Sequence, residues 1–185
     1  MARLRKFAAY RRLDRPYTRT SKYKSKSYVK ALPRHIIVRF VMGDLKRDFQ
    51  YTLELKSKDD LNIRHNSIES ARQSSNRLLE KELGKDYRFQ IVIFPHHILR
   101  ENPVAAGAGA DRFSTGMSHN FGKPHTVAAR IKKGQTMFKL SVDKGNIITA
   151  RDALKRIQHK LPCSCIIAMT ENKKPTENKK PTENK

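Results

Sequence analysis

Two segments with helical periodicity, separated by short strand-like runs, constrain the fold of this chain more than any other feature. Residues 67–83 and 150–160 repeat Leu, Ile and Ala at every third or fourth position, which places these side chains on one face of a helix. The other apolar runs are short, as is typical of strands. Because strand pairs separate the two helices, the element order predicts an α+β fold with mixed or antiparallel sheets.

The sequence also marks the ends of both helices. Asn66 and Glu69, three residues apart, match a capping box at the start of the first helix, and Gly84 is expected to stop it. Thr149 is expected to cap the second helix, and Pro162 to end it.

Six short strands are expected around these helices. In residues 49–56 the side chains alternate, so that Leu53 and Leu55 share one face with Phe49 and Tyr51. The expected strands cover residues 34–42, 49–56, 88–94, 126–131, 136–142 and 163–169.

The charge balance determines the expected partner. The 185 residues include 40 Lys and Arg against 17 Asp and Glu, a net charge of +23. Such a domain repels itself unless a polyanion neutralises it, which favours nucleic acid over an acidic membrane surface. No apolar stretch has the length of a membrane span, and none follows the basic start as it would in a signal peptide, so we expect a cytoplasmic protein without a membrane partner.

Basic residues are densest in residues 1–32, which hold eleven Lys and Arg and one acid. Tyrosines interleave with them, and their rings can stack on bases while the cations neutralise phosphates. We expect an extended arm that becomes ordered on RNA, and the alternative is a basic tail without specific contacts. The arm residues predicted to bind rRNA are Arg3, Arg5, Lys6, Arg11, Arg12, Arg15, Tyr17, Arg19, Lys22, Lys24 and Lys26.

Residues 101–124 form a long segment without apolar periodicity, and they include four of the eight glycines. A loop of this length is usually functional or disordered. Small residues let RNA approach the backbone closely, and Asp111 is placed to hold Arg112. Two interpretations of the apolar residues in this loop stay open, since they could contact a partner or fold back as the core of an Ω-loop; these residues are Phe113, Met117 and Phe121.

The glycines and histidines of the chain do not have the spacing that known nucleotide-binding or catalytic motifs require. Five residues separate Gly116 from Gly122, where a phosphate-binding loop of the Walker type needs four. His96 and His97 are adjacent in a strand-like stretch, so one should be buried and the other should face phosphate. We therefore predict no enzyme, no catalytic residue, no bound metal and no cofactor.

The two cysteines, Cys163 and Cys165, stand two residues apart on an expected strand. That placement suits neither an unstrained disulfide nor a complete zinc site, so a reduced pair is expected. The chain then divides into a basic arm (1–32), a globular domain with its loop (33–169) and a tail (170–185) whose TENKKP repeat cannot bury a core.

Several motifs occur in order between about residues 3 and 169. They resemble the large-subunit ribosomal proteins called L-sixteen in bacteria and L-ten-e in archaea and eukaryotes, and the first and last resemble the archaeal and eukaryotic branch. The motifs are RPYTR (15–19), ESARQSSNRLLEKELGK (69–85), FPHHILRENP (94–103), GADRFSTGM (109–117), FGKP (121–124), AARIKKGQ (128–135) and LPCSC (161–165).

This resemblance implies a hammerhead-type α+β sandwich with two helices, seated on large-subunit rRNA between the central protuberance and the stalk base. It implies that loop 101–124 reaches toward the peptidyl-transferase centre and the acceptor arms of bound tRNA, where RNA performs the chemistry. Large-subunit rRNA, transient tRNA and neighbouring ribosomal proteins are the implied partners. The loop residues placed near tRNA are Arg100, Gly107, Gly109, Asp111, Arg112, Gly116, Met117, Phe121, Gly122 and Lys123.

The chain departs from the family pattern at two positions. Ser118 stands where a basic residue is usual, which lowers the charge at the loop tip, and Thr126 stands at a glycine position, which implies a stiffer loop exit. Two other functions stay as alternatives. One is a free, non-specific nucleic-acid-binding protein, and the other is an RNA-processing enzyme that uses His96, His97 and Asp111.

Overall fold

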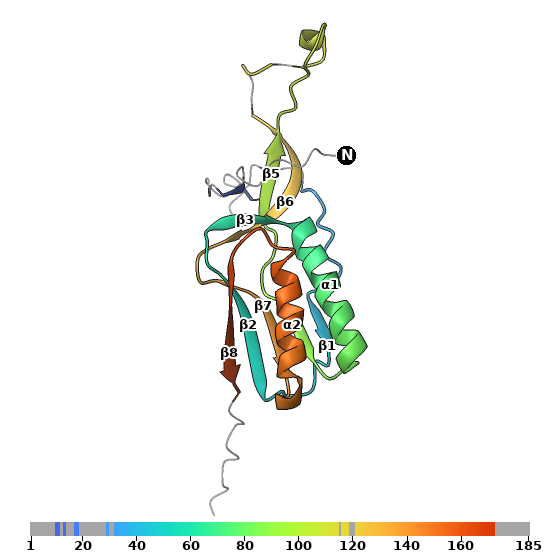
Figure 1. The fold of residues 1–185 in the computed structure, drawn as a ribbon. Helices are drawn as coiled ribbons and strands as arrows, with labels where there is room; N and C mark the ends of the chain where they lie inside the picture. Colours follow the sequence, from blue (N-terminus) through green and yellow to red (C-terminus); the bar gives the residue numbers. More distant parts are fainter. Residues whose placement is uncertain are drawn as a thin grey trace, which may run out of the picture.

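The computed structural model describes residues 10, 11, 13, 17, 18, 29, 32–114, 116–118 and 121–172. Within them, two antiparallel sheets and two α-helices form the architecture drawn in Figure 1, which confirms the predicted α+β class. The larger sheet has the strand order β1-β4-β7-β2-β8. Its strands are β1 (Val41–Gly43), β4 (Arg88–Ile91), β7 (Thr136–Val142), β2 (Tyr51–Ser57) and β8 (Cys165–Glu171).

Helices α1 (His65–Leu83) and α2 (Ile147–Gln158) lie side by side on one face of this sheet, as Figure 1 shows. Leu53 and Leu55 of β2 point into the layer between sheet and helices and are fully buried, as the alternation predicts. We call this five-stranded sheet with its two helices the body. Its other face is polar and is lined by Thr52, Glu54, Arg88, Gln90, Lys139, Ser141, Thr170 and Asn172.

A smaller sheet stands at one end of the body and carries the long loop, which projects away from it (Figure 1). Its strands, in order, are β3 (Leu61–Arg64), β6 (Lys123–Ile131) and β5 (His97–Glu101). A separate, small apolar cluster packs here, formed by Tyr17, Val29, Ile98 and Val127. We call this three-stranded sheet, together with Tyr17, the neck.

The strand expected over residues 34–42 is wrong for most of its length, because only β1 pairs with a neighbour. Residues 34–39 run alongside α1, whose side chains accept the backbone hydrogen bonds that a sheet would otherwise take. Ile36 N–H donates to His65 Nδ1 at 3.2 Å, and Val38 N–H donates to Glu69 Oε2 at 3.3 Å. Side chains of the helix thus replace a neighbouring strand.

Both predicted helix caps are wrong. Helix α1 begins at His65 directly after β3, with Arg64 in extended conformation at the N-cap, so Asn66 lies inside the helix. Helix α2 begins at Ile147 after a short 3-10 turn, which places Thr149 inside it as well. In each case the preceding element determines where the helix starts. The predicted stop is confirmed, since Gly84 follows α1 with a φ of 61°.

Two strands were not predicted. Strand β3 contains a buried Asn62, which interrupts its apolar pattern, and β5 follows Pro95 closely and begins at His97. Strand β6 begins at Lys123, three residues before the predicted start, because it pairs with β5 along the base of the loop. In the described part of the chain, no helix is long and apolar enough to cross a membrane.

The division of the chain into arm, domain and tail stays a prediction. Strand β8 ends at Glu171, and Asn172 N–H donates to the carbonyl of Gln50 at 2.8 Å. The repeat beyond Asn172 lies outside the described residues.

Candidate nucleic-acid interface

The long loop begins and ends on paired strands. Glu101 of β5 is paired with Lys123 of β6, so the strand pairing fixes the distance between the two ends of loop 102–122. Gly122 closes the base, where a Cβ atom would lie 2.8 Å from the backbone carbon of Glu101. Only glycine allows this close approach of the two backbones.

The loop is shaped by its backbone. Gly107, Gly109 and Gly116 all have positive φ values, of 119°, 76° and 65°. A single 3-10 turn, Ala110–Arg112, forms near the tip, and the Asn102 side-chain amide donates to the Gly116 carbonyl at 3.4 Å. Glycine is the residue that adopts these conformations without strain, so its spacing here produces the turns.

The apolar residues of the loop do not form a core of their own. Phe113 is 86% exposed, Met117 69% and Phe121 68%, so the Ω-loop interpretation is wrong. Within the described residues, Asp111 and Arg112 form no ion pair with each other, which also contradicts the expected role of Asp111. The exposed ring of Phe113 and the guanidinium of Arg112, the residue before it, suit a partner that offers both bases and phosphates.

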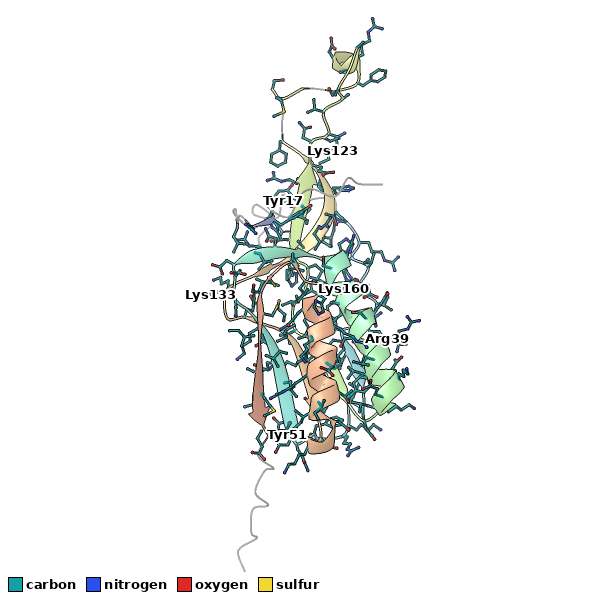
Figure 2. The ribbon with its side chains drawn as sticks, viewed as in Figure 1. Tyr17, Arg39, Tyr51, Lys123, Lys133 and Lys160 are labelled. Atoms are coloured by element: carbon teal, nitrogen blue, oxygen red, sulfur yellow. The ribbon has the colours of Figure 1, made fainter. Side chains whose placement is uncertain are left out.

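The predicted arm and the predicted loop meet at the base of the loop. The Arg100 guanidinium carbon lies 4.3 Å from the ring centroid of Tyr17 and 4.3 Å from that of Phe121. The two rings meet edge to face, with centroids 6.1 Å apart. Figure 2 labels Tyr17 and Lys123 at the end of the molecule from which the loop projects. One cation therefore joins a residue of the arm to a residue of the loop.

Backbone contacts hold Tyr17 in the neck. Its N–H donates to His97 Nδ1 at 3.1 Å, and its carbonyl accepts from Ile98 N–H at 2.8 Å. His97 is buried and His96 is exposed, which confirms that the two point to opposite faces. A phosphate contact of His96 stays a prediction.

Thr126, where we expected a departure from the family pattern, has a structural role. Its hydroxyl lies 2.8 Å from His65 Nε2, while His65 Nδ1 accepts a hydrogen bond from Ile36 N–H. Because Nδ1 accepts, the proton of the neutral ring sits on Nε2, which donates to Thr126. Burial lowers the pKa of His65, and electrostatic repulsion from His35 and Arg64 lowers it further. The Thr126 side chain thus ties β6 to α1.

The structure describes every predicted loop residue but only Arg11 and Tyr17 of the predicted arm. Arg11 is exposed and lines a cleft with Asp59 and Asp60, whereas Tyr17 is buried in the neck. The backbone and ring contacts of His97 and Ile98 with Tyr17 were missed, because HILRE has no apolar alternation that would have indicated a strand. Outside the described residues lie Arg3, Arg5, Lys6, Arg12, Arg15, Arg19, Lys22, Lys24 and Lys26.

Fold and site together define a class of protein. It is a very basic α+β protein with a long exposed loop, whose turns are formed at glycines and which projects from the neck. Tyr17 of the predicted arm is packed in that neck. Residues 14–168 match the model of the family described as Ribosomal protein L16p/L10e. The chain therefore belongs to this ribosomal protein family.

Archaeal relatives support the assignment along nearly the whole chain. A protein of Methanococcus maripaludis named large ribosomal subunit protein uL16 is 43% identical over 173 residues, covering 92% of this chain and 96% of the relative. The protein of that name from Methanococcus aeolicus is 42% identical, covering 90% and 94%. The one from Archaeoglobus fulgidus is 41% identical, covering 83% and 85%.

Proposed function

We propose that the chain is a structural constituent of the large ribosomal subunit in the cytoplasm. In this role it binds rRNA through its basic arm and positions tRNA near the peptidyl-transferase centre through loop 102–122. Family membership supports the ribosomal role, and the net charge of +23 supports a polyanionic partner. Neighbouring ribosomal proteins complete the set of partners.

The junction at Arg100 is the observation that carries the finer part of this proposal. Its guanidinium contacts Tyr17 of the arm and Phe121 of the loop at the same distance. If rRNA holds the arm, Tyr17 becomes a fixed point, and the loop leaves the neck in a fixed direction. Rigid positioning of a projecting loop is what a substrate-orienting role requires.

The loop has the chemistry for contact with RNA and lacks that for catalysis. Phe113 offers an exposed ring for stacking, and Arg112 beside it offers a cation for phosphate. The RNA-processing alternative needs His96, His97 and Asp111 to converge. Instead His97 is buried in the neck, whereas Asp111 is exposed in the 3-10 turn of the projecting loop. We therefore favour positioning over catalysis.

A sucrose gradient of cell lysate in magnesium and high salt tests the proposal. We expect the chain to stay in the large-subunit and whole-ribosome fractions, because an integral constituent is held by many specific contacts. Binding by charge alone weakens steeply with salt. If the chain moves to the top of the gradient, it is a free nucleic-acid-binding protein and the proposal is wrong.

A further inference from the structure

The two cysteines lie closer together than a strand would place them. Strand β8 begins only at Cys165, while Cys163 sits in the bend that follows Pro162. The expectation that both stand on a strand is therefore wrong. The bend brings the two Sγ atoms to 3.6 Å from each other, with both thiols free and half-buried.

The two thiols are equally buried but differ in their surroundings. Cys163 lines a cleft of about 630 Å³, together with Arg11, Asp59 and Asp60. Cys165 is not part of that lining, and it stands opposite the buried Ser57 in the pairing of β8 with β2. A small molecule that enters the cleft therefore lies beside Cys163 rather than Cys165.

The two thiols also differ in acidity. A hydrogen bond from Cys165 lowers the pKa of Cys163; burial and the nearby charge of Asp59 oppose this, and the Ser57 hydroxyl assists it. The pKa of Cys165 is raised, chiefly because its thiol serves as the donor to Cys163 and also because it is buried. The thiolate is the reactive form, so Cys163 is the nucleophile and Cys165 the proton-bearing partner.

We propose that Cys163 and Cys165 form a reactive dithiol, in which Cys163 attacks a peroxide and Cys165 closes a disulfide. The sulfur of the Cys163 thiolate bonds to one peroxide oxygen as the O–O bond breaks. With one proton taken up, hydrogen peroxide yields a sulfenic acid on Cys163 and one water. The sulfur of Cys165 then attacks that of Cys163, the S–O bond breaks, and the departing hydroxide takes the thiol proton of Cys165 as a second water.

Geometry permits the second step. A disulfide has sulfurs about 2.05 Å apart, so the 3.6 Å separation must shorten by about 1.5 Å, within reach of a side-chain rotation. A bridge between residues two apart is strained, and a strained bridge is easily reduced by thiols. In the described residues, no group of three or more His, Cys, Asp and Glu side chains could hold a metal ion.

Mass spectrometry of the full-length chain treated with hydrogen peroxide tests this directly. We expect the loss of two hydrogens, confined to the tryptic peptide of residues 161–173 and reversed by dithiothreitol. Oxidation of the exposed Met169 in that peptide adds an oxygen instead and is distinguished by mass. If peroxide leaves both thiols free for alkylation, the proposal is wrong.

Two conservative variants separate the roles. In Cys165→Ser we expect the reaction to stop at the sulfenic acid, which dimedone traps on Cys163. In Cys163→Ser we expect alkylation and oxidation of the remaining thiol to slow at least about tenfold, because the more acidic thiol, which lines the cleft, is gone. Equal reactivity of the two variants would overturn the assignment of Cys163 as the nucleophile. Neither measurement depends on ribosome binding.

Discussion

The body and the loop are built in opposite ways. In the body, two helices cover one face of a five-stranded sheet, and the largest side chains, such as Phe89 and Phe138, are fully buried. In the loop, the large apolar side chains are exposed, and shape comes from glycines and from one strand pair at the base. The contrast indicates that the body supplies stability, whereas the loop presents its large apolar side chains to solvent.

The sharpest test of this contrast removes one aromatic ring from each region. Phe138 stacks on Phe89 with ring centroids 5.8 Å apart, so Phe138→Ala should lower the free energy of unfolding by about 3–5 kcal/mol. The matched variant Phe113→Ala, in the loop, should change it by less than about 0.5 kcal/mol. Urea denaturation of both proteins measures this difference, and equal losses would contradict the contrast.

The buried ion pair at the start of α1 should give the next largest effect. Glu69 Oε1 lies 2.6 Å from the Arg72 guanidinium, and both side chains are nearly inaccessible. Burial alone would raise the pKa of Glu69, but hydrogen bonds from Arg72 and Gln73 outweigh it and leave the pKa below its ordinary value.

Replacing this carboxylate leaves a buried cation without its partner. We expect Glu69→Ala to cost about 3 kcal/mol, measured by denaturant unfolding. Glu82→Ala, at an exposed position on the same helix, is the control and should have almost no effect. A Glu69→Ala protein as stable as the control would show that the pair does not hold residues 34–39 against α1.

Removing the Arg100 side chain from the neck should change the stability of the protein little but should clearly change the arrangement of the two rings that it contacts. Arg100→Ala removes two cation–π contacts, each worth about 0.5–1 kcal/mol at an exposed site. We expect the free energy of unfolding to decrease by about 1 kcal/mol. We also expect the NMR signals of the Tyr17 and Phe121 rings to shift. Arg151→Ala, an exposed arginine of α2, should leave those signals in place. Unchanged signals in Arg100→Ala would mean that arm and loop are not joined there.

Acidification should loosen the neck by a smaller amount. Since burial lowers the pKa of His65 from the ordinary value of 6.5, the unfolded chain takes up a proton before the folded chain does. The free energy of unfolding should therefore decrease as the pH falls below 6.5, until the lowered pKa of the folded state is passed. His65→Gln should remove this part of the pH dependence in denaturation curves. An unaltered profile would exclude His65 as its source.

The sequence predicted the body better than the neck. Leu53 and Leu55 alternate plainly, and the stripe of α1 ends at Gly84, because burial on one face imposes a period on the residues. The strand prediction was wrong for residues 34–39. An apolar run does not indicate whether its backbone N–H groups form hydrogen bonds with a neighbouring strand or with the side chains of a helix. The hydrogen-bond partners, His65 and Glu69, are distant in sequence.

The candidate site was predicted in composition but not in arrangement. The loop and its glycines were evident from their lack of periodicity, and Arg100 and Phe121 were both named. Their meeting with Tyr17 depends on β5, a strand without a clear apolar pattern. The exposure of Phe113 likewise follows from the tertiary structure, since an apolar residue in a loop is compatible with either burial or contact.

The central claim is that the loop acts on tRNA while the arm anchors the protein. The most direct test compares tRNA binding and sedimentation for ribosomes that carry Arg112→Ala, with the double arm variant Arg11→Ala and Arg12→Ala as the counterpart. We predict that Arg112→Ala enters large subunits normally but weakens tRNA binding several-fold, whereas the arm variant fails mainly in incorporation. Ribosomes with Arg112→Ala that bind tRNA and translate normally would contradict the claim.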